Sequence, residues 1–352
     1  MKRQTIRLTA HQIRRALDEC AKRQTRRRGY VTLPTTRIEL HGVLDLIDNP
    51  YETRGQLAKF DALRSSGSQG RQRVFVHMTN VTHIEPCALL HLAAQVDRLG
   101  QRGIKVRGNY PRDARVRRVL RDADFENFIG GRIRLGEHPK APMLQLRKGR
   151  ASQKLNPDDW IALHQFLKAD PNLSAEDADA FYSAFSECVE NVRQHAFSTG
   201  ATGNWYAVAY RPEIGRPRAV VLDLGVGVPR TIRRKGLDHI FSFAQTVYVE
   251  LFNAINLAVP ETEKVTPEFL HSVLSDDWRA TSLATLGLRT QTDEKRRGNG
   301  LSGLYREVIG RRQGALHVLT GRACVTWTAK EEPVRNSLPF LKGTIVCLEL
   351  GA

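Results

Sequence analysis

Long apolar runs are missing from this chain of 352 residues. No window holds the roughly eighteen consecutive apolar residues that a membrane-spanning helix needs. The N-terminal stretch, MKRQTIRLTAHQIRRALDEC, also lacks the apolar centre of a signal peptide. We therefore expect a cytoplasmic protein that does not enter a membrane.

Cysteine is scarce, and its spacing fits neither a disulfide framework nor a zinc site. The chain has five cysteines, an odd number, with no C-x-x-C pair and no histidine at metal-ligand spacing. The positions are widely scattered: Cys20, Cys87, Cys188, Cys324 and Cys347.

Acidic residues are few relative to basic ones, 37 against 54, which leaves a formal net charge of +17. Such an excess favours contact with nucleic acid, an acidic protein or another anionic surface, although heavy arginine use alone also produces it. We predict a basic helical segment over residues 1–35, because residues 9–28 repeat apolar residues at helical spacing. Its arginine cluster, residues 26–28, suits either phosphate contacts or a solvated helix end.

The remaining composition is that of a globular protein, with 41% hydrophobic and 26% charged residues. The length allows two domains, each with its own core. Residues 130–154 mix Gly, Pro and basic residues, and we place the connection between the domains there. This predicts one domain over residues 36–140 and a second over residues 150–352.

The first domain reads as alternating strands and helices. That order implies parallel pairing with right-handed crossovers, an α/β arrangement. Residues 65–73 form a polar loop. The predicted elements are one or more strands within 37–47, a strand at 74–81, a helix at 88–103 that ends at Gly103, a strand at 104–108 and a helix at 114–128.

The second domain opens with two helices, at 157–169 and 174–197, and Ser174 with Asp177 forms a capping box for the latter. Helices on one face of a mixed sheet make this domain α+β. Around a long helical region, strands are predicted at 204–211, 218–225, 315–321, 323–329 and 344–350.

Three polar residues recur at every fourth position of the second helix: Glu187, Asn191 and His195. Positions four apart lie on one helix face, so these side chains form a polar line. A Glu and an Asn one turn apart suit a site in which Glu activates water and Asn gives an oxygen to Mg²⁺. Taken alone, the same line also fits a hydrogen-bonded helix surface.

A second signal follows an apolar strand that ends at Asp223. Gly225 and Gly227 permit a tight turn and the close approach of a flat ligand. Asp223 is placed to accept a hydrogen bond from an exocyclic amine. The pattern D-x-G-x-G also occurs in plain turns.

A third signal is a glycine-rich stretch that leads into an amphipathic helix: Arg297, Gly298, Asn299, Gly300 and Leu301. Free N–H groups at the positive end of a helix dipole form a site for a polyphosphate. An ordinary loop before a helix gives the same pattern.

In this order the motifs resemble the ATP-binding domain of the GHKL superfamily, the class of gyrase and histidine kinases. The motifs E-x-x-x-N-x-x-x-H, D-x-G-x-G-x-P, G-x-G-L and the final Gly343-Thr344 correspond to the family's elements over residues 155–350. The resemblance implies an α/β sandwich that holds ATP and Mg²⁺ between sheet and helices. It implies Glu187 as general base, Asn191 as Mg²⁺ ligand, Asp223 as adenine reader, Gly225 and Gly227 as the adenine-pocket turn, Gly298, Gly300 and Leu301 as phosphate loop, and His195, Arg297, Asn299 and Thr344 as further nucleotide contacts.

Two departures from the family pattern affect this site. Gln194 stands where many members carry Lys. The resemblance therefore implies that a phosphate contact is either lost or transferred to Arg193 or to the basic residues before Gly298. The segment between Pro229 and Arg297 is far longer than the lid of anti-sigma-factor kinases. We expect a long helical ATP lid that closes on ATP or presents a surface to a partner, with helices at 241–259 and 266–274.

The first domain resembles the STAS fold of anti-sigma-factor antagonists. Its strand at 74–81, the loop that follows and the next helix match the family's layout. The loop carries Ile84-Glu85-Pro86-Cys87-Ala88 in place of the usual I-D-S-S-G, so the phosphorylatable serine is missing and Cys87 lies near its place. Cys87 is either a buried packing residue or a thiol activated at the helix N-terminus.

The main functional hypothesis is an ATP-binding, ATP-hydrolysing, Mg²⁺-dependent switch, in which the nucleotide state controls a protein partner or the STAS-like domain. An anti-sigma-like protein serine kinase with a separate substrate is the alternative enzyme. An ATP-gated nucleic-acid-binding or scaffold protein, using the basic N-terminus, is the alternative outside enzymes. A homodimer through the N-terminal half stays open.

Overall fold

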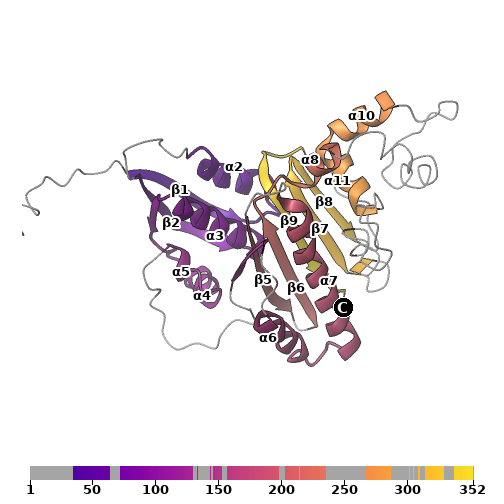
Figure 1. The fold of residues 1–352 in the computed structure, drawn as a ribbon. Coiled ribbons are helices and arrows are strands. Elements are labelled where there is room, and N and C mark those ends of the chain that lie inside the picture. Colours follow the sequence, from indigo (N-terminus) through magenta and orange to yellow (C-terminus); the bar gives the residue numbers. More distant parts are fainter. Residues whose placement is uncertain are drawn as a thin grey trace, which may run out of the picture.

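Two β-sheets organise the chain (Figure 1). The computed structural model describes residues 35–63, 72–129, 146–152, 157–197, 203–213, 215–234, 267–286, 314–328 and 337–351, with the single positions 133, 143, 301, 304, 308 and 309. The predicted basic helix at 9–28 and the lid helix at 241–259 lie outside these residues. The expected mixed α/β class is confirmed, with a parallel three-stranded sheet and a separate antiparallel six-stranded sheet.

The small sheet has the order β1-β2-β3, and both strand pairs are parallel. Parallel pairing was predicted for β2 and β3, whereas the segment of β1 was expected only to add strand structure. Helix α2 was not predicted, although Pro50 at its first position is a typical helix start. The elements are β1 Thr35–Leu44, α2 Pro50–Asp61, β2 Arg73–Ile84, α3 Pro86–Gln101, β3 Lys105–Gly108, α4 Ala114–Asp122 and α5 Glu126–Ile129.

Local capping explains where α3 begins and ends. The Glu85 carboxylate accepts hydrogen bonds from the N–H groups of Cys87 and Ala88, at 2.8 and 3.3 Å. Gly103, with φ +77°, follows the helix end in the left-handed conformation that glycine favours. Cys87 is fully buried and burial raises its pKa well above the usual value, which agrees with a packing role.

The helix predicted over 114–128 is divided into α4 and α5. Asp124 lies between them with φ +62°, a left-handed conformation that ends α4. The one long helix expected there was therefore wrong, because its pattern did not reveal this break.

The large sheet has the order β4-β5-β6-β9-β7-β8. Every strand pair in it is antiparallel, so the expected mixed sheet was wrong. The reason is that β9 lies between β6 and β7 and pairs antiparallel with both. The strands are β4 Arg147–Arg150, β5 Asn204–Glu213, β6 Arg216–Asp223, β7 Ala315–Gly321, β8 Ala323–Thr328 and β9 Leu341–Glu349.

The edge strand β4 lies in the stretch that the sequence suggested as a connection. Its residues, Arg147 to Arg150, pair with β5. Charged residues are common on edge strands, because they discourage pairing with other chains, but they conceal the strand from a hydrophobicity pattern.

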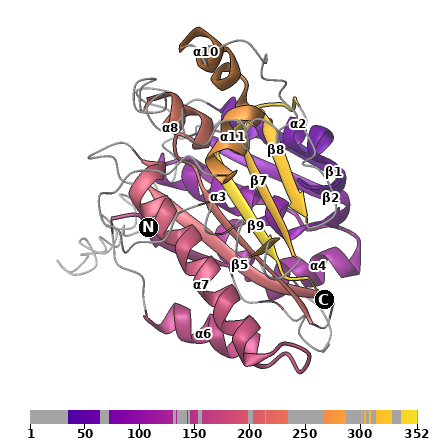
Figure 2. The same ribbon diagram turned by 90° about the vertical axis from the view of Figure 1, so that its right-hand side faces the viewer.

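Helices cover both faces of the large sheet. Helix α7 and helix α11 lie on one face, which Figure 2 views from the front. Helix α3 lies on the opposite face, between the large sheet and the small one (Figure 1). The helices of the second half are α6 Pro157–Lys168, α7 Ala175–Asn191, the π-helical turn η1 Val192–Ala196, α8 Val228–Arg234, α10 Pro267–Ser275 and α11 Asp277–Leu286.

Strand alternation divides the core in two. On β6, Val220 and Leu222 join the cluster with α3 and the small sheet, whereas Ala219 and Val221 join the cluster with α7 and α11. Each buried valine or leucine side chain contributes about 2 kcal/mol. The large sheet is therefore buried on both faces, and the core of the first half is continuous with one of them.

Within the described part of the chain, no helix is both long enough and apolar enough to cross a membrane.

Candidate functional site

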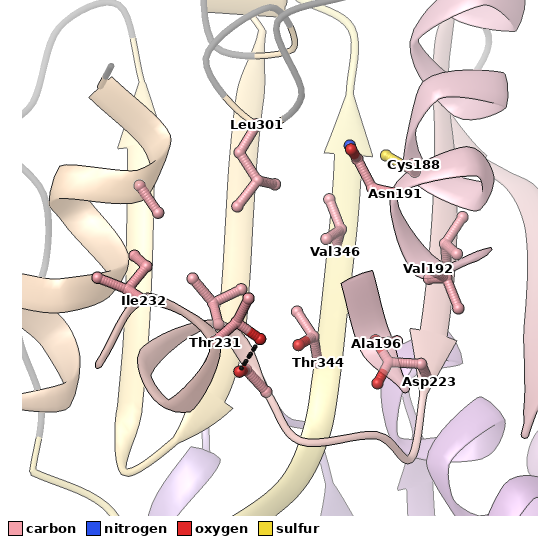
Figure 3. A pocket seen from close by; sticks show the side chains of 14 residues that line it. Cys188, Asn191, Val192, Ala196, Asp223, Thr231, Ile232, Leu301, Thr344 and Val346 are labelled. Carbon is pink, nitrogen blue, oxygen red and sulfur yellow. Dashed lines mark hydrogen bonds between the residues drawn. The ribbon is translucent and has the colours of Figure 1, made fainter. Parts of the chain in front are cut away.

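A hollow of about 730 Å³, including its open mouth, lies between the large sheet and helices α7, α8 and α11 (Figure 3). Val221 and Val346 form part of its sheet side. Segments that are far apart in the sequence meet here. Five of the predicted site residues line it: Asn191, Asp223, Gly227, Leu301 and Thr344.

Helix α7 brings Asn191 to the hollow. Ser174 is the N-cap of the helix, as predicted: the Asp177 N–H donates to Ser174 Oγ at 3.0 Å, and Ser174 Oγ donates to the Asp177 carboxylate at 2.6 Å. The side-chain nitrogen of Asn191 is buried and makes no hydrogen bond within the described structure. This nitrogen is a hydrogen-bond donor, so an acceptor atom of a ligand can supply the missing bond.

The other two residues of the polar line lie differently. Glu187 is half-buried one turn before Asn191, and it is not among the residues that line the hollow. After Asn191 the helix changes to the π form, with i to i+5 hydrogen bonds, so the four-residue spacing no longer keeps His195 on the same line. The main chain of His195 belongs to η1, and its side chain lies outside the described residues.

Asp223 ends β6 beside Ala196, at the opposite end of the hollow from Leu301 (Figure 3). Its side chain is 3% exposed, and its Oδ1 accepts a hydrogen bond from the Gly225 N–H at 2.7 Å. Burial raises the pKa of Asp223 to about 7, although hydrogen bonds from the N–H groups of Gly225 and Thr344 oppose the shift. Among the residues that the structure describes, no basic side chain forms an ion pair with this carboxyl group.

Glycine is required where three segments meet around Asp223. A Cβ at Gly225 would overlap the carbonyl oxygen of Ala196, and a Cβ at Gly343 would overlap that of Asp223. The Val226 N–H donates to the Ala196 oxygen at 2.9 Å, which ties the turn to the end of η1. The D-x-G-x-G pattern therefore forms a turn whose main chain packs directly against the main chain of η1 and of β9.

Gly227 closes the turn and starts α8. It has φ +81°, and its carbonyl accepts hydrogen bonds from the Thr231 N–H and hydroxyl at 3.1 and 3.0 Å (Figure 3). Thr320 links this turn to the other strands, since its hydroxyl donates to the Gly343 carbonyl at 2.8 Å and accepts from the Val228 N–H at 3.2 Å.

The glycine-rich stretch is described only at its end. Arg297, Gly298, Asn299 and Gly300 lie outside the described residues, whereas Leu301 lines the hollow. Arg193, one of the two places expected to take over a phosphate contact, forms an ion pair with Glu190.

Several residues of the site were not predicted. Thr231 and Ile232 lie in the first turns after Gly227, and that position was the only available signal for them. Ala284 comes from α11, which no motif connects to the site. The other unpredicted polar or small residues of the hollow are Cys188 and Ala196.

Cys188 is buried in the hollow wall, and burial raises its pKa well above the usual value, so the thiol stays protonated. The described residues contain no group of three or more His, Cys, Asp or Glu that could hold a metal ion. A magnesium ion that keeps waters and phosphate oxygens as ligands needs only one or two protein oxygens, and Asn191 can supply one.

The lining of the hollow is that of a small-molecule site. Such sites combine apolar walls with a few polar groups. Here apolar side chains surround one carboxyl group, two threonines and one amide that has no hydrogen-bond partner among the described residues.

Comparisons with protein-family models, with curated proteins and with solved structures each found no match to this chain.

Proposed function

We propose that the hollow binds ATP with Mg²⁺, in the manner of the GHKL superfamily that the motifs resemble, and that the chain is an ATP-hydrolysing switch. One observation carries the proposal. Asp223, a carboxyl group that is 3% exposed, lies in the same apolar hollow as Asn191 and Leu301, although these residues come from three distant parts of the sequence.

Asp223 would read the adenine ring. A carboxylate has about four lone-pair positions, and main-chain N–H groups of Gly225 and Thr344 use part of that capacity. An exocyclic amine can donate to the remainder, and such a bond to a charged acceptor is strong where water is excluded. The apolar walls, including Val221 and Val346, suit the faces of a flat ring.

Asn191 and Glu187 would serve the phosphate end. When bound, Mg²⁺ would neutralise phosphate charge, and the side-chain oxygen of Asn191 is the protein atom that would hold it. Glu187, one helical turn earlier, would accept a proton from the attacking water. Leu301 and the glycine-rich stretch before it would complete the phosphate side.

A path of hydrogen bonds supports a switch that involves the small sheet. Arg233 of α8 donates to Asp277 at 2.7 Å, and the Arg322 N–H donates to the same carboxylate at 2.8 Å. Arg322 lies in the β7–β8 turn, whose neighbouring carbonyl groups are bound by Arg54 of α2. Helix α8 also lines the hollow through Thr231 and Ile232, so a nucleotide that moves α8 acts on this path.

Calorimetry with ATP, with and without Mg²⁺, tests binding, and phosphate release by the purified chain tests hydrolysis. We expect ATP to bind and ADP to displace it. We also expect slow phosphate release that requires Mg²⁺. Transfer of labelled γ-phosphate to an added protein would favour the serine kinase instead. Absence of ATP binding under all these conditions would refute the proposal.

A further inference from the structure

The small sheet turns one face to the core and the other to solvent. On β1, Ile38 and Leu40 are buried. Arg37, Glu39 and His41, which alternate with them along the strand, are exposed. Alternation of this kind places the exposed set on the face opposite α2 and α3. Parallel sheets are commonly covered on both faces, so an exposed face on one needs an explanation.

The other two strands extend this face with basic and aromatic side chains. On β2, Arg73 is exposed and Phe75 and His77 are half-buried, between the buried Val74, Val76 and Met78. On β3, Lys105 and Arg107 are exposed. We call the set Arg37, Glu39, Arg73, Phe75, His77, Lys105 and Arg107 the outer sheet face.

Strand register places an aromatic ring between two guanidinium groups. Phe75 is the partner of Arg37 on one side and of Arg107 on the other. Neighbouring strands lie about 4.8 Å apart, so the three side chains form one row across the sheet. His77 is next to Phe75 on the same face, and the two ring centroids are 6.5 Å apart.

The outer sheet face is strongly positive. It carries four cations, Arg37, Arg73, Lys105 and Arg107, against the single carboxylate of Glu39. Arg37 and Glu39 form an ion pair of 3.1 Å, but their side chains are 57% and 61% exposed, so water screens the pair. The face therefore attracts a polyanion.

We propose that the outer sheet face binds single-stranded nucleic acid, with a base stacked on Phe75 and phosphates contacted by the flanking arginines. Aromatic rings on an open sheet surrounded by basic groups are a general means of binding single strands, because every base has a flat face to stack. A duplex has no free base face, so stacking on Phe75 selects the single strand. The outer sheet face shares no residue with the hollow, and the proposal does not depend on ATP binding.

Fluorescence anisotropy of the full chain with a labelled single-stranded oligonucleotide, without ATP, tests the proposal. We expect Phe75→Ala to weaken binding about 5- to 100-fold and Phe75→Trp to restore it, as base stacking requires. The double variant R37A/R107A should weaken binding and lower the slope of log affinity against log salt by about one to two. R150A/K168A, which removes two exposed charges on other elements, is the matched control.

Every outcome of these measurements either supports or overturns the proposal. Because Arg37 and Arg107 are exposed, R37A/R107A keeps the test valid even if Phe75→Ala unfolds, which circular dichroism would reveal. Binding by R37A/R107A equal to that of the control overturns the proposal. The proposal is also overturned if a duplex binds as tightly as the single strand, or if polyglutamate competes equally well. Either result would mean that the outer sheet face binds a different partner.

Discussion

The guanidinium of Arg54 donates a hydrogen bond of 2.7 Å to the main-chain carbonyl of Ala323, which lies 269 positions later in the chain. It also donates to the carbonyl groups of Gly321 and Pro339, at 3.0 and 3.3 Å. Arg54 is 1% exposed, and burial lowers its pKa to about 10, which leaves it charged at neutral pH. A cation of α2 thus fastens the small sheet to the β7–β8 hairpin.

Replacement of Arg54 by Met should lower the free energy of unfolding by about 3 kcal/mol, because buried carbonyl groups lose their donors. Chemical denaturation monitored by circular dichroism measures this. The exposed Lys168→Ala should change stability by less than about 0.5 kcal/mol. A similar small effect of Arg54→Met would show that the contact does not hold the two parts together.

Asp223→Asn should weaken ATP binding by about 10- to 100-fold, since a hydrogen bond to a charged acceptor is replaced by a weaker one. It should also stabilise the ligand-free protein above pH 7. The raised pKa, about 7, means that the folded state loses stability as pH rises from about 4 to 7 and the carboxyl group ionises. Calorimetry and denaturation measure the two effects, and unchanged affinity would remove Asp223 from the adenine site.

Glu187→Gln should reduce phosphate release by about 100-fold or more while ATP affinity stays within a few-fold of the wild type. The amide keeps the size of the side chain but cannot accept a proton from water. Single-turnover hydrolysis with bound ATP separates this effect from binding. Turnover at the wild-type rate would mean that Glu187 is not the general base.

Glu85 provides a pH dependence in the contact between α3 and the large sheet. The Tyr210 hydroxyl donates to Glu85 at 3.2 Å, and burial raises the pKa of Glu85 to about 7. Its contribution to stability is complete below about pH 4 and is lost as pH rises through about 7. The stability of Glu85→Gln relative to the wild type should therefore increase over this range, as urea denaturation at several pH values can show.

The exposed Glu39→Gln is the control for this measurement, and its stability relative to the wild type should change far less over the same range. Parallel curves for Glu85→Gln and the wild type would contradict the assignment.

Gly343→Ala should lower stability by at least about 2 kcal/mol and weaken ATP binding. Gly343 has φ +85°, and an added Cβ would overlap the Asp223 carbonyl oxygen. Gly55→Ala in α2, where a Cβ meets no atom within 4 Å, should instead stabilise by about 0.5–1 kcal/mol. Equal thermal stability of the two variants would show that the junction around Asp223 tolerates a side chain.

Local patterns predicted most of the regular elements of the second half. The strand predicted at 315–321 has the bounds of β7, and Ser174 begins α7 as its capping box indicated. Apolar side chains and capping residues act over a few positions, so a linear pattern records them. Helices α2, α8 and α11 and strand β4 were not predicted. Of these, α2 and β4 have weak or charged patterns, and their structure depends on neighbouring elements.

The short-range features could be read from the amino-acid sequence: the helix that carries Glu187 and Asn191, the strand that ends at Asp223 and the glycines that follow it. Three long-range features could not: β9 lies between β6 and β7, α3 covers the face of the large sheet that is turned to the small sheet, and Asn191, Asp223 and Leu301 share one hollow. The two groups differ in the sequence distance over which the interactions act. Dihedral preferences and caps depend on adjacent residues, whereas strand order and the hollow depend on how distant apolar faces bury one another.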